Sequence, residues 1–197
     1  MNTPFIAGQR LSLRGITHTD LQGSMSEWVN DREVTRYLFR GAYPCSPERL
    51  AQEHQMRLND NTNLELAIIS TPEEVHIGIV GLHAIHPIAR AAELRVLIGD
   101  KTYWNRGYGT EATQLTLAYA FELLNLHKVY LGVNAAHVGA VRSYEKAGFV
   151  REGLLRDEIW RNGCYYDAIR MSILVSEYRQ VRDTWPLADT IARQFSP

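Results

Sequence analysis

The sequence is poor in cysteine, has no long apolar run and carries almost no net charge. Its two cysteines, Cys45 and Cys164, have neither metal-ligand spacing nor the paired pattern of a disulfide framework, so we expect a reduced, cytoplasmic setting and no metal. No apolar run approaches the ~20 residues that span a membrane, and the first residues lack the apolar core of a signal peptide. The net charge of −1 argues against a large basic surface. These absences argue against membrane and nucleic-acid partners.

What remains is the composition of an ordinary globular domain. The 197 residues are 45% hydrophobic and 22% charged, which is enough apolar material for one substantial core. No internal repeat or low-complexity tract divides the chain. We therefore expect a single domain over residues 1–178. Residues 179–197 are expected to be a C-terminal extension of that domain, either as a docked helix or as a loose tail.

Apolar periodicity predicts strands and helices along the whole chain. A strand is expected where hydrophobic residues alternate or run together, and a helix where they recur every three or four positions. Thr17 with Asp20 has the pattern of a capping box, and Ser46 followed by Pro47 marks another helix start. The predicted strands are about 10–14, 64–70, 75–83, 94–98, 128–133, 150–159 and 164–175; the predicted helices are about 17–29, 31–38, 46–59, 110–125 and 138–147, with loops at 39–44 and 86–90.

Residues 92–111 hold the most informative local pattern. An apolar strand is followed by a short loop with Gly107 and Gly109, and then by helical spacing from Thr110. Such a loop presents unpaired N–H groups at a helix N-terminus, where anions bind, and glycine lets a phosphate approach the main chain. Arg106 adds a positive charge. The Gly-Lys-Ser/Thr of a Walker loop and the third glycine of a dinucleotide fingerprint are missing, so this pattern alone also allows a plain glycine-containing turn.

Three motifs are similar to those of the GNAT acetyltransferase superfamily and occur in its order. Residues 104–109, WNRGYG, resemble its pyrophosphate loop Q/R-x-x-G-x-G/A, with Trp104 in place of Gln or Arg. Residues 143–149, SYEKAGF, resemble its YEKxGF signature. Residues 162–167, NGCYYD, resemble the NGxYxD turn of the branch that acetylates ribosomal-protein N-termini, polyamines and amino sugars. The resemblance covers residues 9 to about 178.

The resemblance implies a fold and a cofactor site. The fold is α+β: a mixed, mostly antiparallel sheet with helices on both faces, in which the strand at 94–98 and the strand from Lys128 splay apart to admit acetyl-CoA. The main chain of the first strand would pair with the pantetheine arm, with an oxyanion donor near Leu97, and the glycine loop would hold the pyrophosphate. The residues expected to contact the cofactor are Val96, Leu97, Ile98, Arg106, Gly107, Tyr108, Gly109, Thr110, Asn134, His137 and Tyr144.

His137 is a second departure from the superfamily pattern, which commonly has Asn at this place to contact the pantetheine arm. An imidazole can also donate and accept hydrogen bonds, so the contact can persist. A histidine here can also titrate near neutral pH. The alternatives are that Asn134 takes over the contact, or that His137 is a helix-start residue that faces solvent.

Acetyl transfer to an amine requires a base for the ammonium, donors for the oxyanion and a proton for the departing thiolate. By resemblance, Glu93 is the base, often through an ordered water, and Tyr144 is the acid that faces the coenzyme sulfur. The residues alone also allow Glu93 to be a strand-end carboxylate paired with Arg90 or Arg95, and Tyr144 to be a core aromatic. Because no cysteine occupies a motif position, we expect direct attack in a ternary complex.

The acceptor is the least determined part of the prediction. The branch offers a peptide N-terminus, an amino sugar, or a polyamine or aminoglycoside-type antibiotic. Acidic and basic residues are mixed over 31–53, and the arginines there favour a peptide N-terminus or an amino sugar over a polycation. The alternatives are a polyamine or aminoglycoside-type N-acetyltransferase, or a non-catalytic acyl-CoA-binding sensor on the same fold. A homodimer is a further expectation from the family.

Overall fold

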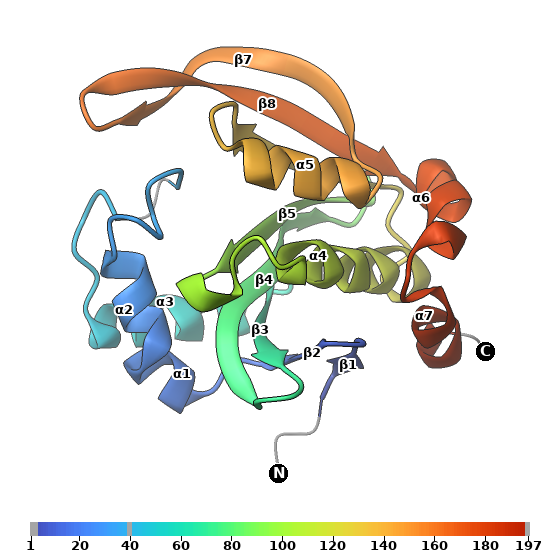
Figure 1. The fold of residues 1–197 in the computed structure, drawn as a ribbon, viewed down its shortest axis with the longest axis horizontal. Helices are drawn as coiled ribbons and strands as arrows, with labels where there is room; N and C mark the ends of the chain where they lie inside the picture. The colour runs from blue at the N-terminus through green and yellow to red at the C-terminus, as the bar shows by residue number, and fades with distance from the viewer. Residues whose placement is uncertain (1–3, 39–40, 196–197) are drawn as a thin grey trace.

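The computed structural model of the chain describes residues 4–38 and 41–195. Its central feature is an eight-stranded sheet with the order β1-β2-β3-β4-β5-β6-β8-β7, which crosses the molecule in Figure 1. The strands are β1 Ile6–Ala7, β2 Leu11–Gly15, β3 Leu64–Ser70, β4 Val75–His86, β5 Ala91–Ile98, β6 Lys128–Asn134, β7 Val150–Arg161 and β8 Cys164–Leu174. Every neighbouring pair is antiparallel except β5 and β6. The sheet is therefore mixed and mostly antiparallel, as predicted.

The parallel pair β5 and β6 is joined over only part of its length. Three residues of β5, Ala91–Glu93, pair with Lys128–Tyr130 of β6. Beyond them, β5 continues to Ile98 and β6 continues to Asn134 on separate paths. The predicted splay of the central strands is confirmed.

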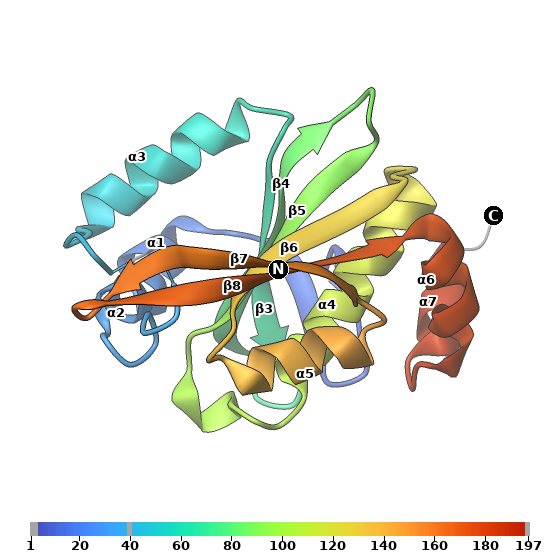
Figure 2. The ribbon, with the colours of Figure 1, turned by 90° about the horizontal axis from the view of Figure 1, so that it is seen from above.

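Helices cover both faces of this sheet, in agreement with the prediction. On one face lie α1 His18–Gln22, α2 Ser24–Asn30 and α3 Pro47–Leu58; on the other lie α4 Tyr108–Ala118, which continues as the π-helix η2 Tyr119–Leu123, and α5 Val138–Lys146 (Figure 2). Each face buries its own apolar cluster. The larger includes Leu82, Leu94 and Leu115, and the smaller joins Trp28 to the half-buried Leu97. Leu94 and Leu97, three positions apart on β5, thus pack into opposite clusters, because successive side chains of a strand point to opposite faces of the sheet.

Two of the predicted helices differ from the structure. The helix expected over 17–29 is divided at Gly23, whose φ of −96° and ψ of −122° are not helical. The helix expected over 31–38 is wrong, because residues 32–37 form turns; Phe39 and Arg40 lie outside the described residues. The Asp31 carboxylate accepts the N–H groups of Glu33 and Val34, a local bond that competes with helix formation.

The C-terminal residues form a docked helix rather than a loose tail. After α6 Val175–Val181 and the short 3-10 turn η3 Arg182–Thr184, the last described element is α7 Ala188–Phe195. Trp185, Leu187 and Ile191 are buried in the larger cluster. Gln194 also exchanges two hydrogen bonds with the main chain of Ala7, at 2.8 and 2.5 Å, which ties α7 to β1. β1 and α7 thus stabilise each other.

Candidate acetyl-CoA site

The site is centred on the fork between β5 and β6. Glu93 pairs with Tyr130 in the last register position that joins the two strands. The following residues of β5, Leu94–Ile98, have no register partner on β6. Main-chain N–H and C=O groups along such an edge need a hydrogen-bonding partner, and an extended ligand arm can supply one by adding as a strand. Val96 and Leu97, predicted to contact the pantetheine arm, lie on this stretch.

The third residue predicted on this edge, Ile98, is already engaged. The indole Nε1–H of Trp104 donates to the carbonyl oxygen of Ile98 at 2.7 Å. Trp104 is half-buried and packs against the cluster around Trp28 and Leu97. The Trp104 side chain therefore points toward the end of β5 and links the loop to that strand. It is not free to contact a phosphate.

The glycine loop leads into the start of α4 as the sequence predicted. Gly107 is the N-cap with φ of +85°, in the left-handed region that favours glycine, and Asn105 before it has φ of +58°. Within the described part of the chain, no side chain caps this helix start. The first-turn N–H groups, which belong to Tyr108, Gly109 and Thr110, therefore remain free to bind an anion.

The loop, the end of β5 and α5 meet at this point. The hydroxyl groups of Thr110 and Ser143 are hydrogen-bonded at 2.8 Å. A Cβ atom placed on Gly109 would lie 3.7 Å from Ile98 and 3.9 Å from Ser143. The structure thus brings Ser143 of α5, 33 residues after Thr110 in the sequence, to the loop and the end of β5. Arg106 lies on the outside of the loop, where its Nη1 donates to the carbonyl of Thr102 at 3.2 Å.

Tyr144 lies on α5 next to Ser143 and packs in an edge-to-face contact on Phe149, with ring centroids 5.7 Å apart. Desolvation by burial raises the pKa of its hydroxyl to about 12. A tyrosine in this state keeps its proton at neutral pH, so a proton is present for a departing thiolate.

His137 is a helix-start residue, but it does not simply face solvent. Its Nδ1 accepts the N–H of Ala140, and its ring stacks on Tyr37 with centroids 4.3 Å apart. Burial, followed by the charge of Arg36, lowers the pKa of His137, so the ring is neutral at pH 7. Asn134 is buried, and its side-chain oxygen accepts the N–H of Ala136 at 2.9 Å. Both residues shape the turn that leads into α5.

Glu93 forms an ion pair with Arg95, one of the two partners that the sequence allowed. The Glu93 Oε2 to Arg95 Nη2 distance is 2.7 Å, and the arginine side chain is 61% exposed. The other candidate, Arg90, instead donates to the main-chain and side-chain oxygens of Asn125. Because an exposed pair contributes little in water, the Glu93 carboxylate remains accessible to another cation.

Sequence reasoning missed a polar cluster on the same face of the sheet. His83 of β4 is paired with Glu93 across the strands, and its Nδ1 lies 3.1 Å from the side-chain oxygen of Asn63. Its Nε2 lies 3.6 Å from Glu65, whose carboxylate accepts Nη1 of Arg57 at 2.8 Å. Burial lowers the pKa of His83 more than Glu65 raises it. The sequence does show polar residues at alternate positions of two apolar strands, which was the available signal for this cluster. It does not show the register between the strands, which brings the residues together.

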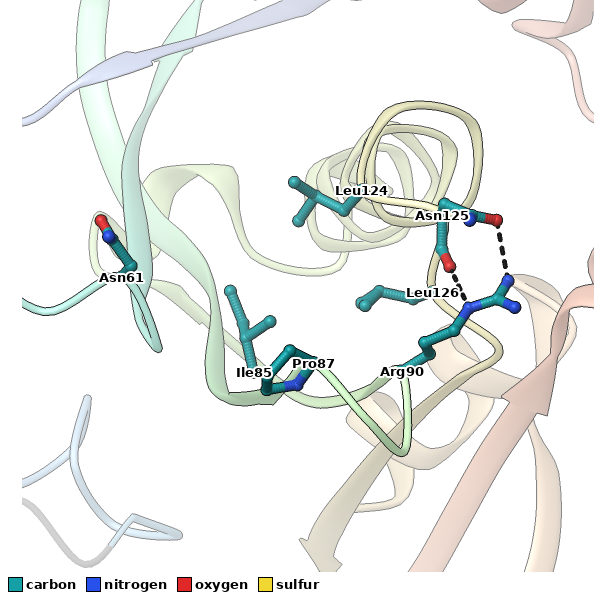
Figure 3. A pocket seen from close by; sticks show the side chains of 7 residues that line it. All are labelled: Asn61, Ile85, Pro87, Arg90, Leu124, Asn125 and Leu126. Carbon is teal, nitrogen blue, oxygen red and sulfur yellow. Dashed lines mark hydrogen bonds between the residues drawn. The ribbon is translucent and has the colours of Figure 1, made fainter.

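A cavity of about 330 Å³ lies away from these residues, at the turn between β4 and β5. Figure 3 shows its lining, in which Arg90 and Asn125 are joined by hydrogen bonds. None of the predicted site residues lines it.

In the described segments, 4–38 and 41–195, no cluster of three or more His, Cys, Asp or Glu side chains is arranged to hold a metal ion. Nor does any helix there have the length and apolar character to cross a membrane.

Comparison with known proteins identifies the fold and the chemistry. Residues 10–150 match the family model described as an acetyltransferase (GNAT) domain. The chain is 34% identical to the spermidine N(1)-acetyltransferase of Vibrio cholerae serotype O1 over 169 residues, 86% of this chain and 95% of that protein. It is 32% identical to the corresponding enzyme of Escherichia coli K12, over 85% of this chain and 88% of that one.

A solved structure agrees with these relatives. The crystal structure of spermidine N-acetyltransferase from Vibrio cholerae in complex with CoA and spermine superposes with a TM-score of 0.80 at 34% identity, covering 86% of this chain and 98% of that one. A putative ribosomal N-acetyltransferase of Bacillus subtilis is 28% identical over 76% of this chain and 82% of its own length. The chain therefore belongs to the GNAT acetyltransferase family, whose co-substrate is acetyl-CoA.

Proposed function

We propose that the protein transfers the acetyl group of acetyl-CoA to a primary amine of a small polyamine such as spermidine. The amine nitrogen attacks the thioester carbonyl in a ternary complex, the C–S bond breaks, and the products are the N-acetylated polyamine and coenzyme A. The sequence favoured a peptide N-terminus or an amino sugar and kept the polyamine as an alternative. The spermidine N-acetyltransferase relatives support the polyamine instead, and they support an enzyme over an acyl-CoA sensor.

The observation that carries this proposal is a pair of carboxylates on one face of the sheet beside the fork. Glu93 on β5 is the register partner of His83 on β4. Glu65 on β3 is paired with Gly81, two residues before His83 and therefore on the same face, and its carboxylate lies 3.6 Å from His83 Nε2. In the free protein, Arg95 and Arg57 are the cations on these carboxylates. An acceptor ammonium can replace the exposed Arg95 on Glu93 at small cost, because that pair is open to water.

One of the arginines over 31–53 that argued against a polycation is engaged in an ion pair. Arg49 pairs with Glu53 at 3.0 Å within α3. The Arg36 guanidinium lies over the ring of Tyr37, 4.7 Å from its centre. Arg40 lies outside the described residues. The pairing of Arg49 weakens the objection to a polyamine acceptor that the linear sequence raised.

The proposed roles of the residues follow from their places around the fork. Glu93 takes the proton of the attacking ammonium, directly or through a water, and Tyr144 gives a proton to the departing thiolate. The main-chain edge at Val96 and Leu97 holds the pantetheine arm and supplies the oxyanion donor. The pyrophosphate binds the loop residues Arg106, Gly107, Tyr108, Gly109 and Thr110, and His137 or Asn134 contacts the arm.

Calorimetric titration with acetyl-CoA tests the loop assignment. We expect Arg106→Glu to weaken binding by tenfold or more, roughly the loss of one charge-assisted contact together with added repulsion. Unchanged affinity in this variant would remove the loop from the proposed site. Arg151→Gln is the matched control, because Arg151 is an exposed arginine paired with Glu145 outside the fork.

An amine panel tests the acceptor. Release of coenzyme A is followed with spermidine, spermine, a short peptide with a free N-terminus and glucosamine, each beside an enzyme blank because Cys164 is exposed and reacts with thiol reagents. We expect the polyamines to have the highest kcat/KM and the turnover to fall in Glu93→Gln. A preference for the peptide or the amino sugar would overturn the polyamine proposal and leave the acetyltransferase intact.

Assembly is a separate proposal. A homodimer remains the prediction from family resemblance, and the mass of the protein in solution, measured by light scattering, checks it.

A further inference from the structure

Arg10, a residue to which the sequence gave no role beyond the first strand, lies against the glycine loop. Its Nη1 donates to the carbonyl oxygen of Arg106 at 2.8 Å, and its guanidinium lies 4.9 Å from the centre of the Tyr108 ring. A Cβ atom placed on Gly107 would lie 3.0 Å from Nη2 of Arg10. Arg10 therefore touches three consecutive residues of the loop.

Glu111 holds this arginine in place from the first turn of α4. Its Oε2 accepts Nε of Arg10 at 2.9 Å, and its Oε1 accepts the main-chain N–H groups of Gln9 and Arg10 at 2.8 and 2.9 Å. The glutamate is 4% exposed. The buried Glu111 carboxylate is satisfied by these three donors, and it leaves Gln9 and Arg10 little freedom to move relative to α4.

The bond from Arg10 to the carbonyl of Arg106 has a consequence for the next residue. The C=O of Arg106 and the N–H of Gly107 belong to one planar trans peptide, in which the two groups point in opposite directions. Arg10 holds the carbonyl toward its guanidinium and so directs the Gly107 N–H away from the Arg10 side chain. Gly107 tolerates the required φ of +85° because it is a glycine.

We propose that Arg10, held by Glu111, is a positioning residue for acetyl-CoA: it orients the Arg106–Gly107 peptide so that the loop presents its N–H groups to the pyrophosphate. This inference rests on the loop assignment in the proposed function. Trp104 and Arg106 do not supply this orientation, because Trp104 is bonded to Ile98 and the Arg106 guanidinium to Thr102.

Two acetyl donors separate this role from a merely structural one. Acetyl-CoA carries the pyrophosphate, whereas S-acetyl-pantetheine has the same thioester and arm without it. The first variant is Arg10→Gln, which removes both the positive charge and the guanidinium group. The second is Arg10→Lys, which keeps the charge but cannot reach Glu111 and the Arg106 carbonyl together. Arg151→Gln again serves as the matched control, and thermal melting shows that each variant is folded.

We expect both Arg10 variants to raise the KM for acetyl-CoA and the Kd for CoA about tenfold, the scale of one charge-assisted hydrogen bond, with kcat at saturation unchanged. Turnover of S-acetyl-pantetheine should equal that of the unmodified protein. Equal losses with both donors, or no loss with either, would overturn the inference. If Arg10→Gln melts below the assay temperature, Arg10→Lys gives the answer.

The same titrations distinguish failure of this inference from failure of the proposed function. If Arg106→Glu leaves acetyl-CoA binding intact, the loop assignment fails and the role of Arg10 fails with it. If Arg106→Glu weakens binding while both Arg10 variants bind normally, the loop assignment stands and only the positioning role is overturned.

Discussion

Glu93 and Tyr130 are the last paired residues of β5 and β6, and the two strands separate directly beyond them. This pairing places the Glu93 carboxylate where the main-chain edge of β5 becomes available to a ligand arm. The same strand therefore carries the candidate base and the candidate binding edge. A shift of one residue in register would turn Glu93 to the opposite face of the sheet, so the pairing itself is what positions the carboxylate.

Glu93→Gln should lower kcat/KM for the amine about 100-fold, because it removes the proton acceptor while keeping the size of the side chain. The Kd for acetyl-CoA should not change. Steady-state kinetics with spermidine and calorimetry with acetyl-CoA measure the two effects. Arg95→Gln is the control: it removes only an exposed ion pair and should retain activity. Full activity of Glu93→Gln would assign the base to a water chain.

Tyr144→Phe should lower kcat about 100-fold and change the KM for acetyl-CoA much less, because only the proton delivered to the thiolate is lost. Desolvation raises the pKa of Tyr144 to about 12, so its hydroxyl remains protonated over the usual assay range. We therefore expect no loss of kcat from this group up to about pH 10, the ordinary pKa of tyrosine. A variant as active as the unmodified protein would contradict the assignment.

Asp20 makes the stability of the protein depend on acid pH. Burial alone would raise its pKa, but hydrogen bonds from Arg14 and Thr17 outweigh burial and lower the pKa from 3.8 to about 2. Because the folded pKa is the lower one, the stabilisation is present above about pH 4 and is lost as the pH falls toward about 2. It amounts to about 2 kcal/mol.

Urea unfolding at several pH values measures the stabilisation that Asp20 contributes. Asp20→Asn should be about 3 kcal/mol less stable at pH 7, because it leaves Arg14 buried without its partner. The variant should also lose less stability than the unmodified protein between pH 4 and 2. Parallel pH profiles of the two proteins would show that Asp20 does not carry the effect.

Trp185→Ala should lower the free energy of unfolding by about 3 kcal/mol, the usual cost of removing a large buried aromatic. Trp185 is 5% exposed and packs edge-to-face on Tyr178, with centroids 5.6 Å apart. The kcat/KM of the folded fraction should be unchanged, because Trp185 packs on Tyr178 and makes none of the contacts described at the fork. A loss below about 1 kcal/mol would mean that the C-terminal segment adds little to the core.

Local patterns predicted well where apolar runs and turn residues set the conformation. The strand 64–70 has its predicted bounds, and the hairpin turns at Asn162 and Gly163, both with positive φ as a tight hairpin requires. The prediction failed over residues 31–38. There, Val34 and Thr35 are buried, and Thr35 accepts a hydrogen bond from Arg161 at the tip of the β7–β8 hairpin. These tertiary contacts and the local hydrogen bonds of the Asp31 carboxylate together outweighed the helical pattern.

The sequence by itself determined the strand, the glycine loop and the helix at the cofactor site, because glycine conformation and apolar spacing act over a few residues. It also indicated the family. Only the tertiary structure decided which distant residues support that site. Arg10 meets Glu111 across about a hundred positions of chain, and Glu93 meets His83 through strand register. Such contacts depend on how the elements pack around the sheet, and no local pattern of residues specifies that packing.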